Sequence, residues 1–199
     1  MNNKLAVVDD LNDYHIVIET FISEQYIWLK KGLKPHTIAI DIGAHCGDSA
    51  VFLAQQPNID IVLSYDNNSK VYERAKLIIA KCRKEVREKI LYLPAKIVEN
   101  SRELHNPDIY VPRISLSDIL SRERKPIIIK CDVEGAEHNI FRNLYAVDFK
   151  NVYKIQIEYH HGPQKLPNIL KALGFRVKVE RPWTITKDLG EVGWIYAER

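Results

Sequence analysis

The sequence predicts an α/β fold with a mostly parallel β-sheet and an antiparallel hairpin at its C-terminus. Apolar runs without polar alternation recur along the chain, as expected of parallel strands that are buried on both faces. Segments with helical periodicity separate these runs, as in βαβ units. Near the end, residues 175–185 and 192–196 alternate apolar and polar side chains around a turn at 187–190, which indicates the hairpin.

A length of 199 residues is typical of one domain. Residues 1–34 are expected to form an N-terminal helical extension packed on the core, because apolar side chains from 14 to 29 fall at helical spacing. A basic last turn and Gly32 would end that helix. Residues 35–199 would then form the main domain.

The first expected strand, residues 37–42, leads into a glycine loop and a helix. The pattern is D-x-G-x-x-x-G from Asp41 through Gly43 to Gly47, with Asp48 near the helix start. Glycine lets a backbone approach a ligand closely, and a helix N-terminus offers unpaired N–H groups. A dinucleotide loop needs G-x-G-x-x-G instead, which disfavours an NAD-dependent oxidoreductase. The loop resembles that of class I S-adenosylmethionine-dependent methyltransferases.

The second expected strand, residues 59–66, also ends in an acid. Asn67 and the polar residues after it favour a turn and a helix start, and a helix is expected from about 70 to 86. In a βαβ cofactor fold, an acid at the end of the second strand can accept both ribose hydroxyls. Asp66 is therefore a candidate for binding a ribose.

The third expected strand spans residues 90–98. It contains Pro94, which cannot donate to a ladder and indicates an edge strand or a strand end. Residues 99–113 are polar and interrupted by proline, so a loop is expected there, followed by a short capped helix at 115–120.

Ionisable residues gather after the fourth and fifth expected strands, residues 126–132 and 152–162. Asp132, Glu158 and His160 should converge, because ligands of open α/β sheets bind beyond the carboxyl ends of the strands. A helix after Gly135 would carry the apolar residues Ile140, Phe141, Leu144 and Tyr145. A later helix would have Pro167 near its start and Gly174 after its end.

Segments 41–48 and 130–137 together resemble the FkbM-type methyltransferase family. Its patterns are roughly D-I-G-A-N-x-G and K-x-D-V-E-G-x-E. Residues 157–160 resemble the fifth-strand end of that family, and residues 173–177 its closing hairpin. The resemblance covers about 37–198, with two departures: His45 stands where the family usually has Asn, and Asp66 where it often has Glu.

The resemblance implies a class I, Rossmann-like, seven-stranded sheet with helices on both faces. It implies methyl transfer from S-adenosylmethionine, leaving S-adenosylhomocysteine, usually to a hydroxyl oxygen of a sugar, polyketide or other small metabolite. The domain at 35–199 would bind that cofactor. The candidate cofactor-binding residues are Asp41, Gly43, Ala44, His45, Gly47, Asp48, Asp66, Asn67, Ala95 and Glu134.

A hydroxyl acceptor must lose a proton, so a catalytic base is expected. His160 is the best base on intrinsic pKa, with Asp132 or Glu158 as an orienting group or as the base itself. Two acids at adjacent strand ends could also hold Mg²⁺, but a third ligand is not evident and simple acid–base catalysis is favoured. Lys130, Glu137 and His161 are expected to be structural or solvated.

Composition narrows the alternatives. A net charge of +3, with acids interleaved among the basic residues of 70–89, makes a nucleic-acid partner a minority expectation. The three cysteines lack metal or disulfide spacing, and no apolar run suits a membrane span, so a cytoplasmic protein is expected. A catalytically weak cofactor-binding module and an RNA methyltransferase remain as alternatives. The sequence does not indicate an oligomeric state.

Overall fold

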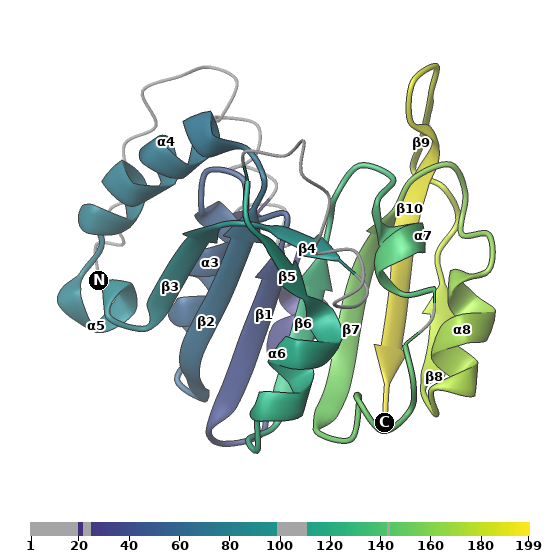
Figure 1. The fold of residues 1–199 in the computed structure, drawn as a ribbon, viewed down its shortest axis with the longest axis horizontal. Helices are drawn as coiled ribbons and strands as arrows, with labels where there is room; N and C mark the ends of the chain where they lie inside the picture. The colour runs from purple at the N-terminus through teal and green to yellow at the C-terminus, as the bar shows by residue number, and fades with distance from the viewer. Residues whose placement is uncertain (1–19, 22–24, 99–110, 143) are drawn as a thin grey trace.

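A computed structural model describes residues 20–21, 25–98, 111–142 and 144–199 (Figure 1). Its central sheet has the strand order β3-β2-β1-β6-β7-β10-β8, and β9 pairs with β10 beside this path. The strands are β1 (Thr37–Ile42), β2 (Ile59–Asp66), β3 (Ile90–Pro94), β6 (Ile127–Cys131), β7 (Val152–Tyr159), β8 (Arg176–Val179), β9 (Thr184–Thr186) and β10 (Gly190–Glu198). The first five strands of the path are mutually parallel, and β10 is antiparallel to β7, β8 and β9. The predicted mostly parallel sheet with its C-terminal antiparallel hairpin is confirmed, and β9 adds an eighth strand to the seven of the path.

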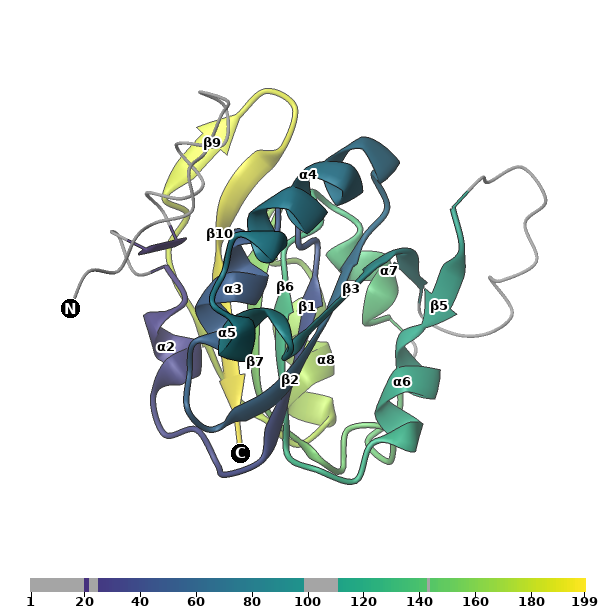
Figure 2. The same cartoon turned by 90° about the vertical axis from the view of Figure 1, so that its left-hand side faces the viewer.

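Helices cover both faces of this sheet (Figure 2). On one side lie α2 (Ile27–Lys30), α3 (Asp48–Ala54), α4 (Ser69–Ala80) and α5 (Lys84–Arg87), and on the other lie α6 (Leu116–Arg122), α7 (Glu137–Ile140) and α8 (Leu166–Ala172). Successive residues of β1 point to opposite faces. Ile38, Ile40 and Ile42 join the core under α6 and α8, whereas Ala39 joins the core under α3. A strand with apolar neighbours on both sides has no polar face, which explains the unbroken apolar run in the sequence.

The expected helix at 70–86 is two helices in the structure. α4 begins with Asn68, whose side chain accepts a hydrogen bond from the Lys70 N–H, and it ends at Ala80. Arg83 then takes an extended conformation, with ψ of 148°, which interrupts the helical ladder. The break allows α5 to bury Val86 in the core shared with α3.

The expected third strand also divides. β3 ends at Pro94 and is the edge strand of the sheet, as predicted. A tight bond from the Ala95 N–H to the Leu93 carbonyl then turns the chain. The residues that follow form β4 (Lys96–Val98), which pairs in parallel with β5 (Arg113–Ser115) in a separate two-stranded sheet. The expected loop at 99–113 therefore ends before Arg113, and its residues 99–110 lie outside the described residues.

Two other expected helices differ in extent. α7 ends at Ile140, although Phe141 and Leu144 beyond it are buried, so their spacing reflects burial rather than helix. Most of the expected N-terminal helix lies outside the described residues, and α2 is its described part. By contrast, α6 with its Ser115 cap and α8 with proline in its first turn agree with the sequence.

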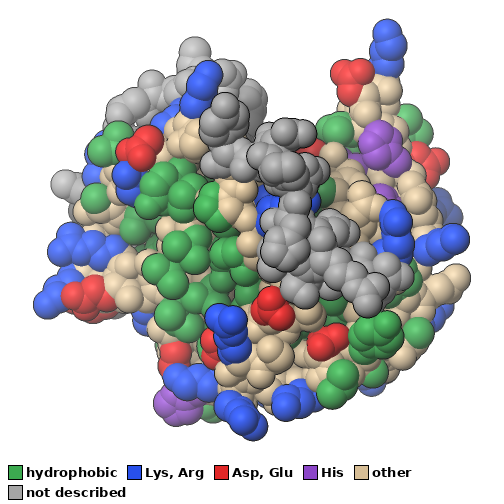
Figure 3. Space-filling model, in the orientation of Figure 1, with side chains coloured by type: hydrophobic (Ala, Val, Ile, Leu, Met, Phe, Trp, Pro, Cys, Tyr) green, Lys and Arg blue, Asp and Glu red, His purple; other side chains and the backbone are tan. Residues whose placement is uncertain are grey.

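Hydrophobic side chains gather over β2 and β3 on the face shown in Figure 3. In the described part of the chain, none of the helices combines the length and apolar character needed to cross a bilayer.

Candidate active site

A cavity of about 630 Å³ opens at the carboxyl ends of the parallel strands. Its walls include residues that end or follow β1, β2, β3, β6 and β7. Ten of the thirteen candidate site residues line it: Gly43, His45, Asp48, Asp66, Asn67, Ala95, Asp132, Glu134, Glu158 and His160. The other three, Asp41, Ala44 and Gly47, do not line it and belong to the end of β1 and the glycine loop.

The glycine loop is packed tightly between the ends of β2 and β6. The N–H groups of Gly43 and Ala44 both donate to the Tyr65 carbonyl, at 2.9 and 3.0 Å. Gly43 has a φ of +78°, and a Cβ built on it would lie 1.7 Å from the carbonyl oxygen of Asp132. Gly47 caps α3 with a φ of +85°. Two glycines are therefore needed here for backbone angle, and Gly43 also for space.

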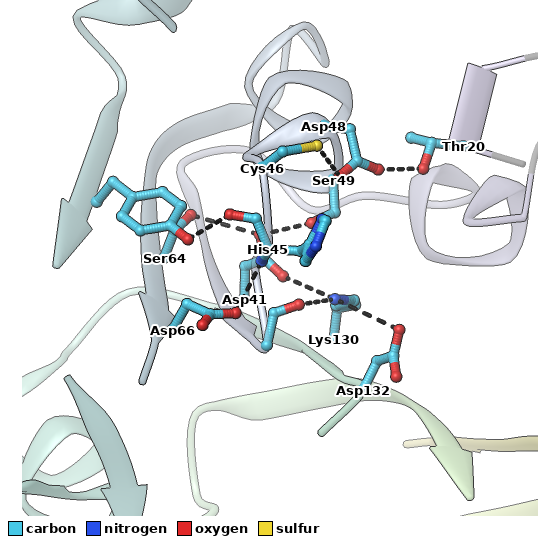
Figure 4. Close-up of polar contacts among 12 residues, drawn as sticks. Thr20, Asp41, His45, Cys46, Asp48, Ser49, Ser64, Asp66, Lys130 and Asp132 are labelled. Carbon is cyan, nitrogen blue, oxygen red and sulfur yellow. Dashed lines mark hydrogen bonds and ion pairs between the residues drawn. The ribbon is translucent and has the colours of Figure 1, made fainter. Parts of the chain in front are cut away.

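Lys130 and Asp41 form a buried ion pair beneath this loop (Figure 4). The Lys130 Nζ lies 3.3 Å from Asp41 Oδ1 and donates to the Gly43 carbonyl at 2.6 Å. It also lies 4.0 Å from Asp132 Oδ2. The second Asp41 oxygen accepts hydrogen bonds from Ser49 at 2.8 Å and from Ser64 at 3.4 Å. Lys130 thus connects the first-strand acid, the loop and a candidate catalytic residue.

Burial shifts the pKa values of these groups in opposing ways. Burial raises the pKa of Asp41, and the Lys130 charge only partly offsets that rise. Burial alone lowers the pKa of Lys130, but Tyr26, Asp41 and Asp132 outweigh it and hold that pKa well above its ordinary value. Burial likewise raises the pKa of Asp48, whose carboxylate accepts a hydrogen bond from Thr20. The acidic neighbours of Lys130 therefore favour its charged form.

Asp66 is held at the cavity wall by two backbone N–H groups. Its Oδ2 accepts from His45 at 2.9 Å, and its Oδ1 accepts from Asn68 at 2.8 Å. A carboxylate oxygen can accept two hydrogen bonds, so each oxygen keeps capacity for a ligand hydroxyl. His45 has a φ of +42°, its carbonyl accepts from the Tyr92 hydroxyl, and its buried Nδ1 has no hydrogen-bond partner among the described residues.

Glu137 ties together the ends of β6 and β7. Its Oε2 accepts from the Gly135 N–H at 2.8 Å, and its Oε1 accepts from the His160 N–H at 2.7 Å. The His160 Nδ1 lies 3.4 Å from the same Oε1. Burial alone raises the pKa of Glu137, but its bonds with His160 outweigh burial and lower it. The expectation that Glu137 is structural fits this arrangement.

The same contact affects His160 as a base. Burial alone lowers its pKa, but Glu137, followed by Asp132 and Glu134, raises it above the ordinary histidine value. The intrinsic pKa used in the sequence argument therefore underestimates how firmly His160 holds its proton. Beside it, Glu158 is 7% exposed.

Thirteen of the 23 residues that line the cavity were not candidates from the sequence, and Gln25 and Tyr26 are among them. Gln25 and Tyr26, just before α2, line its wall, and the Tyr26 ring packs against Phe52 and Trp194. Helical spacing alone could not assign them to the site. In the described ranges, no group of three or more His, Cys, Asp and Glu side chains is arranged to hold a metal ion.

The sheet order and the cavity at its carboxyl edge define a class I methyltransferase fold. The sequence profile of the methyltransferase FkbM domain matches residues 41–177. The chain therefore belongs to the FkbM methyltransferase family, as its motifs predict. A search of curated proteins gives no match.

Solved structures agree on the fold. Methyltransferase FkbM from Methylobacillus flagellatus superimposes with a TM-score of 0.61 at 16% identity, covering 96% of this chain and 56% of that one. An rRNA methylase from Streptococcus thermophilus gives 0.52 at 12% identity, covering 89% and 96%. TrmK from M. capricolum, solved with S-adenosylhomocysteine, gives 0.52 at 15% identity, covering 87% and 67%. At these identities the likeness concerns the fold.

Proposed function

We propose that this chain transfers a methyl group from S-adenosylmethionine to a hydroxyl oxygen of a small acceptor. One observation carries the proposal: a single cavity contains Asp66, expected to bind the cofactor, and Asp132, Glu158 and His160, expected to act on the acceptor. Membership of a methyltransferase family supports the transferred group. The solved S-adenosylhomocysteine complex of TrmK, which shares the fold, supports the cofactor.

The residues near β1, β2 and β3 fit such a cofactor. Asp66 presents a fixed carboxylate suited to a ribose diol, since two backbone N–H groups hold it in place. Val71, Ala95 and Ile97 give the same wall an apolar part that suits an adenine ring. When bound, S-adenosylmethionine supplies a methyl group on a sulfonium, which an oxygen nucleophile can displace in line.

The residues near β6 and β7 would hold and deprotonate the acceptor. Because His160 Nδ1 faces Glu137, Nε2 is the ring nitrogen left for an acceptor hydroxyl. His160 must first lose its own proton to act as a base, and Glu137 opposes that loss. Asp132 and Glu158 are the other candidates for the base, or for the group that orients the hydroxyl. General-base assistance is typically worth roughly 10²–10⁴-fold in rate.

Two other functions are weighed against this one. An RNA methyltransferase has fold-level support from the rRNA methylase neighbour, but basic side chains at the cavity would be needed to attract phosphates. The walls instead carry more acids than lysines. A cofactor-binding module without turnover is distinguished only by assay.

The test has two stages. Calorimetry with S-adenosylhomocysteine should show binding of one ligand per chain. Incubation with S-adenosylmethionine and a panel of hydroxyl compounds should then yield S-adenosylhomocysteine together with an O-methylated product. Binding without turnover of any acceptor would favour the binding module. Loss of turnover in EDTA with recovery in Mg²⁺ would favour metal assistance over a side-chain base.

A further inference from the structure

The ring of His160 faces the carboxylate of Glu137. His160 is buried in the cavity wall, and its Nδ1 has no hydrogen-bond partner among the described residues. The Glu137 Oε1 lies 3.4 Å from this nitrogen, which is long for a hydrogen bond but within ion-pair distance. Hydrogen bonds that serve catalysis are often long before a substrate binds and shorten in the complex. The two side chains therefore have the arrangement of a histidine base with a carboxylate behind it.

Backbone hydrogen bonds hold Glu137 in this position. Its side chain is fully buried, and its two oxygens are bonded to different segments. Oε2 accepts from the Gly135 N–H at 2.8 Å, and Oε1 accepts from the His160 N–H at 2.7 Å. A carboxylate oxygen can accept two hydrogen bonds, so Oε1 can bind the backbone N–H and the ring N–H of His160 together. The backbone of His160 thus fixes the carboxylate relative to its own ring.

His138, the residue after Glu137, has a different role. Its Nε2 lies 2.8 Å from the His160 carbonyl oxygen and 3.6 Å from Glu137 Oε1. A carbonyl oxygen only accepts hydrogen bonds, so Nε2 carries a proton in this contact. It therefore cannot take up a proton from Glu137, and no relay runs through the two histidines. His138 supports the backbone of His160 and leaves the Glu137 carboxylate to the His160 ring.

We propose that Glu137 is the positioning residue of the base His160, because it keeps the proton of the neutral ring on Nδ1 and leaves the lone pair of Nε2 for the acceptor hydroxyl. The inference rests on the proposed function and deepens it. The sequence favours Asp132 or Glu158 for the orienting role. Asp132, however, lies 4.0 Å from the Lys130 Nζ, and the contact with His160 Nδ1 belongs to Glu137.

The step that this pair assists balances as a base-assisted displacement. The acceptor oxygen gives its proton to His160 Nε2 and forms a bond to the methyl carbon. The electron pair of the broken carbon–sulfur bond stays on the sulfur of S-adenosylhomocysteine. His160 is then an imidazolium beside the Glu137 carboxylate, which stabilises its charge, and it returns the proton to water from Nε2. Glu137 remains ionised throughout.

The charges around the ring distinguish the nearby carboxylates. Burial alone lowers the pKa of His160, and Glu137 makes the largest contribution that raises it. Asp132 and Glu134, in the loop after β6, raise the same pKa less. Removal of the Glu137 charge should therefore lower the pKa of His160 more than removal of either of the others.

Nuclear magnetic resonance of the histidine rings tests the assignment on the full chain without any acceptor. Proton–nitrogen correlation spectra distinguish a protonated ring nitrogen from an unprotonated one, and His160→Gln identifies the signals of His160 among those of the seven histidines. We expect the neutral His160 ring of the wild type to carry its proton on Nδ1. A neutral ring protonated on Nε2 would overturn the inference, and this result requires no variant of Glu137.

Titration of the same signals compares variants. Glu137→Gln removes the charge and keeps the size of the side chain. Loss of an opposite charge this close should lower the inflection of the His160 ring by at least about one pH unit. Asp132→Asn should lower it less. His138→Gln, which removes the contact with the His160 carbonyl and leaves the Glu137 charge in place, should not reproduce the shift.

Two outcomes of the titration would overturn the inference. A larger shift in Asp132→Asn than in Glu137→Gln would assign the role to Asp132. Equal shifts in Glu137→Gln and His138→Gln would mean that the segment has only loosened. Retained affinity for S-adenosylhomocysteine shows that each variant is folded. If Glu137→Gln does not fold, Glu137→Asp takes its place, and it should keep Nδ1 protonated because it retains the charge.

Turnover separates positioning from support of the fold. With a hydroxyl compound that the wild type methylates, Glu137→Gln should lower kcat, leave KM nearly unchanged and move the inflection of the pH–rate profile to lower pH. A purely structural role would reduce the amount of folded protein without moving the inflection. Failure of the wild type to bind S-adenosylhomocysteine would instead contradict the proposed function, whereas the protonation of the His160 ring would still test the role of Glu137.

Discussion

The Nζ of Lys130 lies 2.6 Å from the carbonyl oxygen of Gly43 and 3.3 Å from Asp41 Oδ1. A side chain of β6 thereby fixes the loop that follows β1 and neutralises the acid that ends this strand. Lys130 is 2% exposed and Asp41 is 0% exposed, so neither charge can turn to water if the other is lost. This pair gives the first prediction.

Lys130→Met should destabilise the chain strongly, because it leaves Asp41 buried without its cation. The expected loss of unfolding free energy is about 3–5 kcal/mol. Urea denaturation of three proteins measures it: wild type, Lys130→Met and the double variant with Asp41→Asn, which should recover part of the loss. Lys125→Met, which breaks an exposed pair with Asp60, should cost far less, because exposed ion pairs contribute little to stability. Equal losses for the two variants would show that the buried pair contributes no more to stability than the exposed pair.

Gly43→Ala should lower the melting temperature far more than Gly32→Ala. Both glycines have a positive φ, +78° and +64°, so both alanines incur backbone strain. A Cβ at position 43 would also meet the Asp132 carbonyl at 1.7 Å, whereas nothing lies within 4 Å of one at position 32. Differential scanning calorimetry measures both melting temperatures, and the difference between the two shifts reports the steric clash at position 43. Similar shifts for the two variants would mean that the loop yields easily.

Asp66→Asn should weaken S-adenosylhomocysteine binding by about tenfold or more, since hydrogen bonds to a charged acceptor are worth about 1.5–3 kcal/mol. The measurement is calorimetry, with Asp60→Asn as the control, because Asp60 lies at the surface in pairs with Lys125 and His36. An affinity unchanged in Asp66→Asn would place the ribose elsewhere in the cavity.

His160 should stabilise the fold below neutral pH. Its folded pKa is raised, because Glu137 outweighs burial, so folding favours the protonated form. The advantage of wild type over His160→Gln should be complete below about pH 6.5, the ordinary histidine pKa, and should decline as pH rises through the higher folded pKa. Urea denaturation of both proteins between about pH 5 and pH 9 measures this difference in unfolding free energy as a function of pH.

The same shift applies to activity. If His160 is the base, the turnover rate should rise with pH, with its inflection above about 6.5. His160→Gln should lose turnover and keep its affinity for S-adenosylhomocysteine. A flat pH profile together with full activity of the variant would move the role of base to Asp132 or Glu158.

The motifs of the sequence and the family they resemble were sufficient to predict a mostly parallel sheet with a C-terminal hairpin and ten residues of the cavity wall. Each of those residues lies at or after the carboxyl end of a strand, and parallel strands bring these ends to one edge. The break between α4 and α5 was not visible, because Cys82 and Val86 keep helical spacing across it. Lys130 was expected to be structural or solvated, and no local pattern could decide between the two or name its buried partners. Tyr26 lies far from the cavity residues in sequence, and only the packed fold brings it to them.

The hydrogen bonds of Glu137 separate the part of the cavity that would carry out acid–base chemistry from the part that could determine acceptor specificity. The buried Glu137 carboxylate accepts hydrogen bonds from the backbone after β6 and from the backbone after β7. These bonds hold the segments that carry Asp132, Glu158 and His160 in place before any ligand binds. Because these segments are already ordered, binding of the acceptor does not incur the entropy cost of ordering them. Gln25 and Tyr26, which also line the cavity, form a part of the wall that comes from a different segment of the chain, and neither has a described contact with Glu137. Substitutions there could alter the shape offered to an acceptor while leaving the acid–base geometry intact, which makes this wall the natural place for relatives to diverge in substrate.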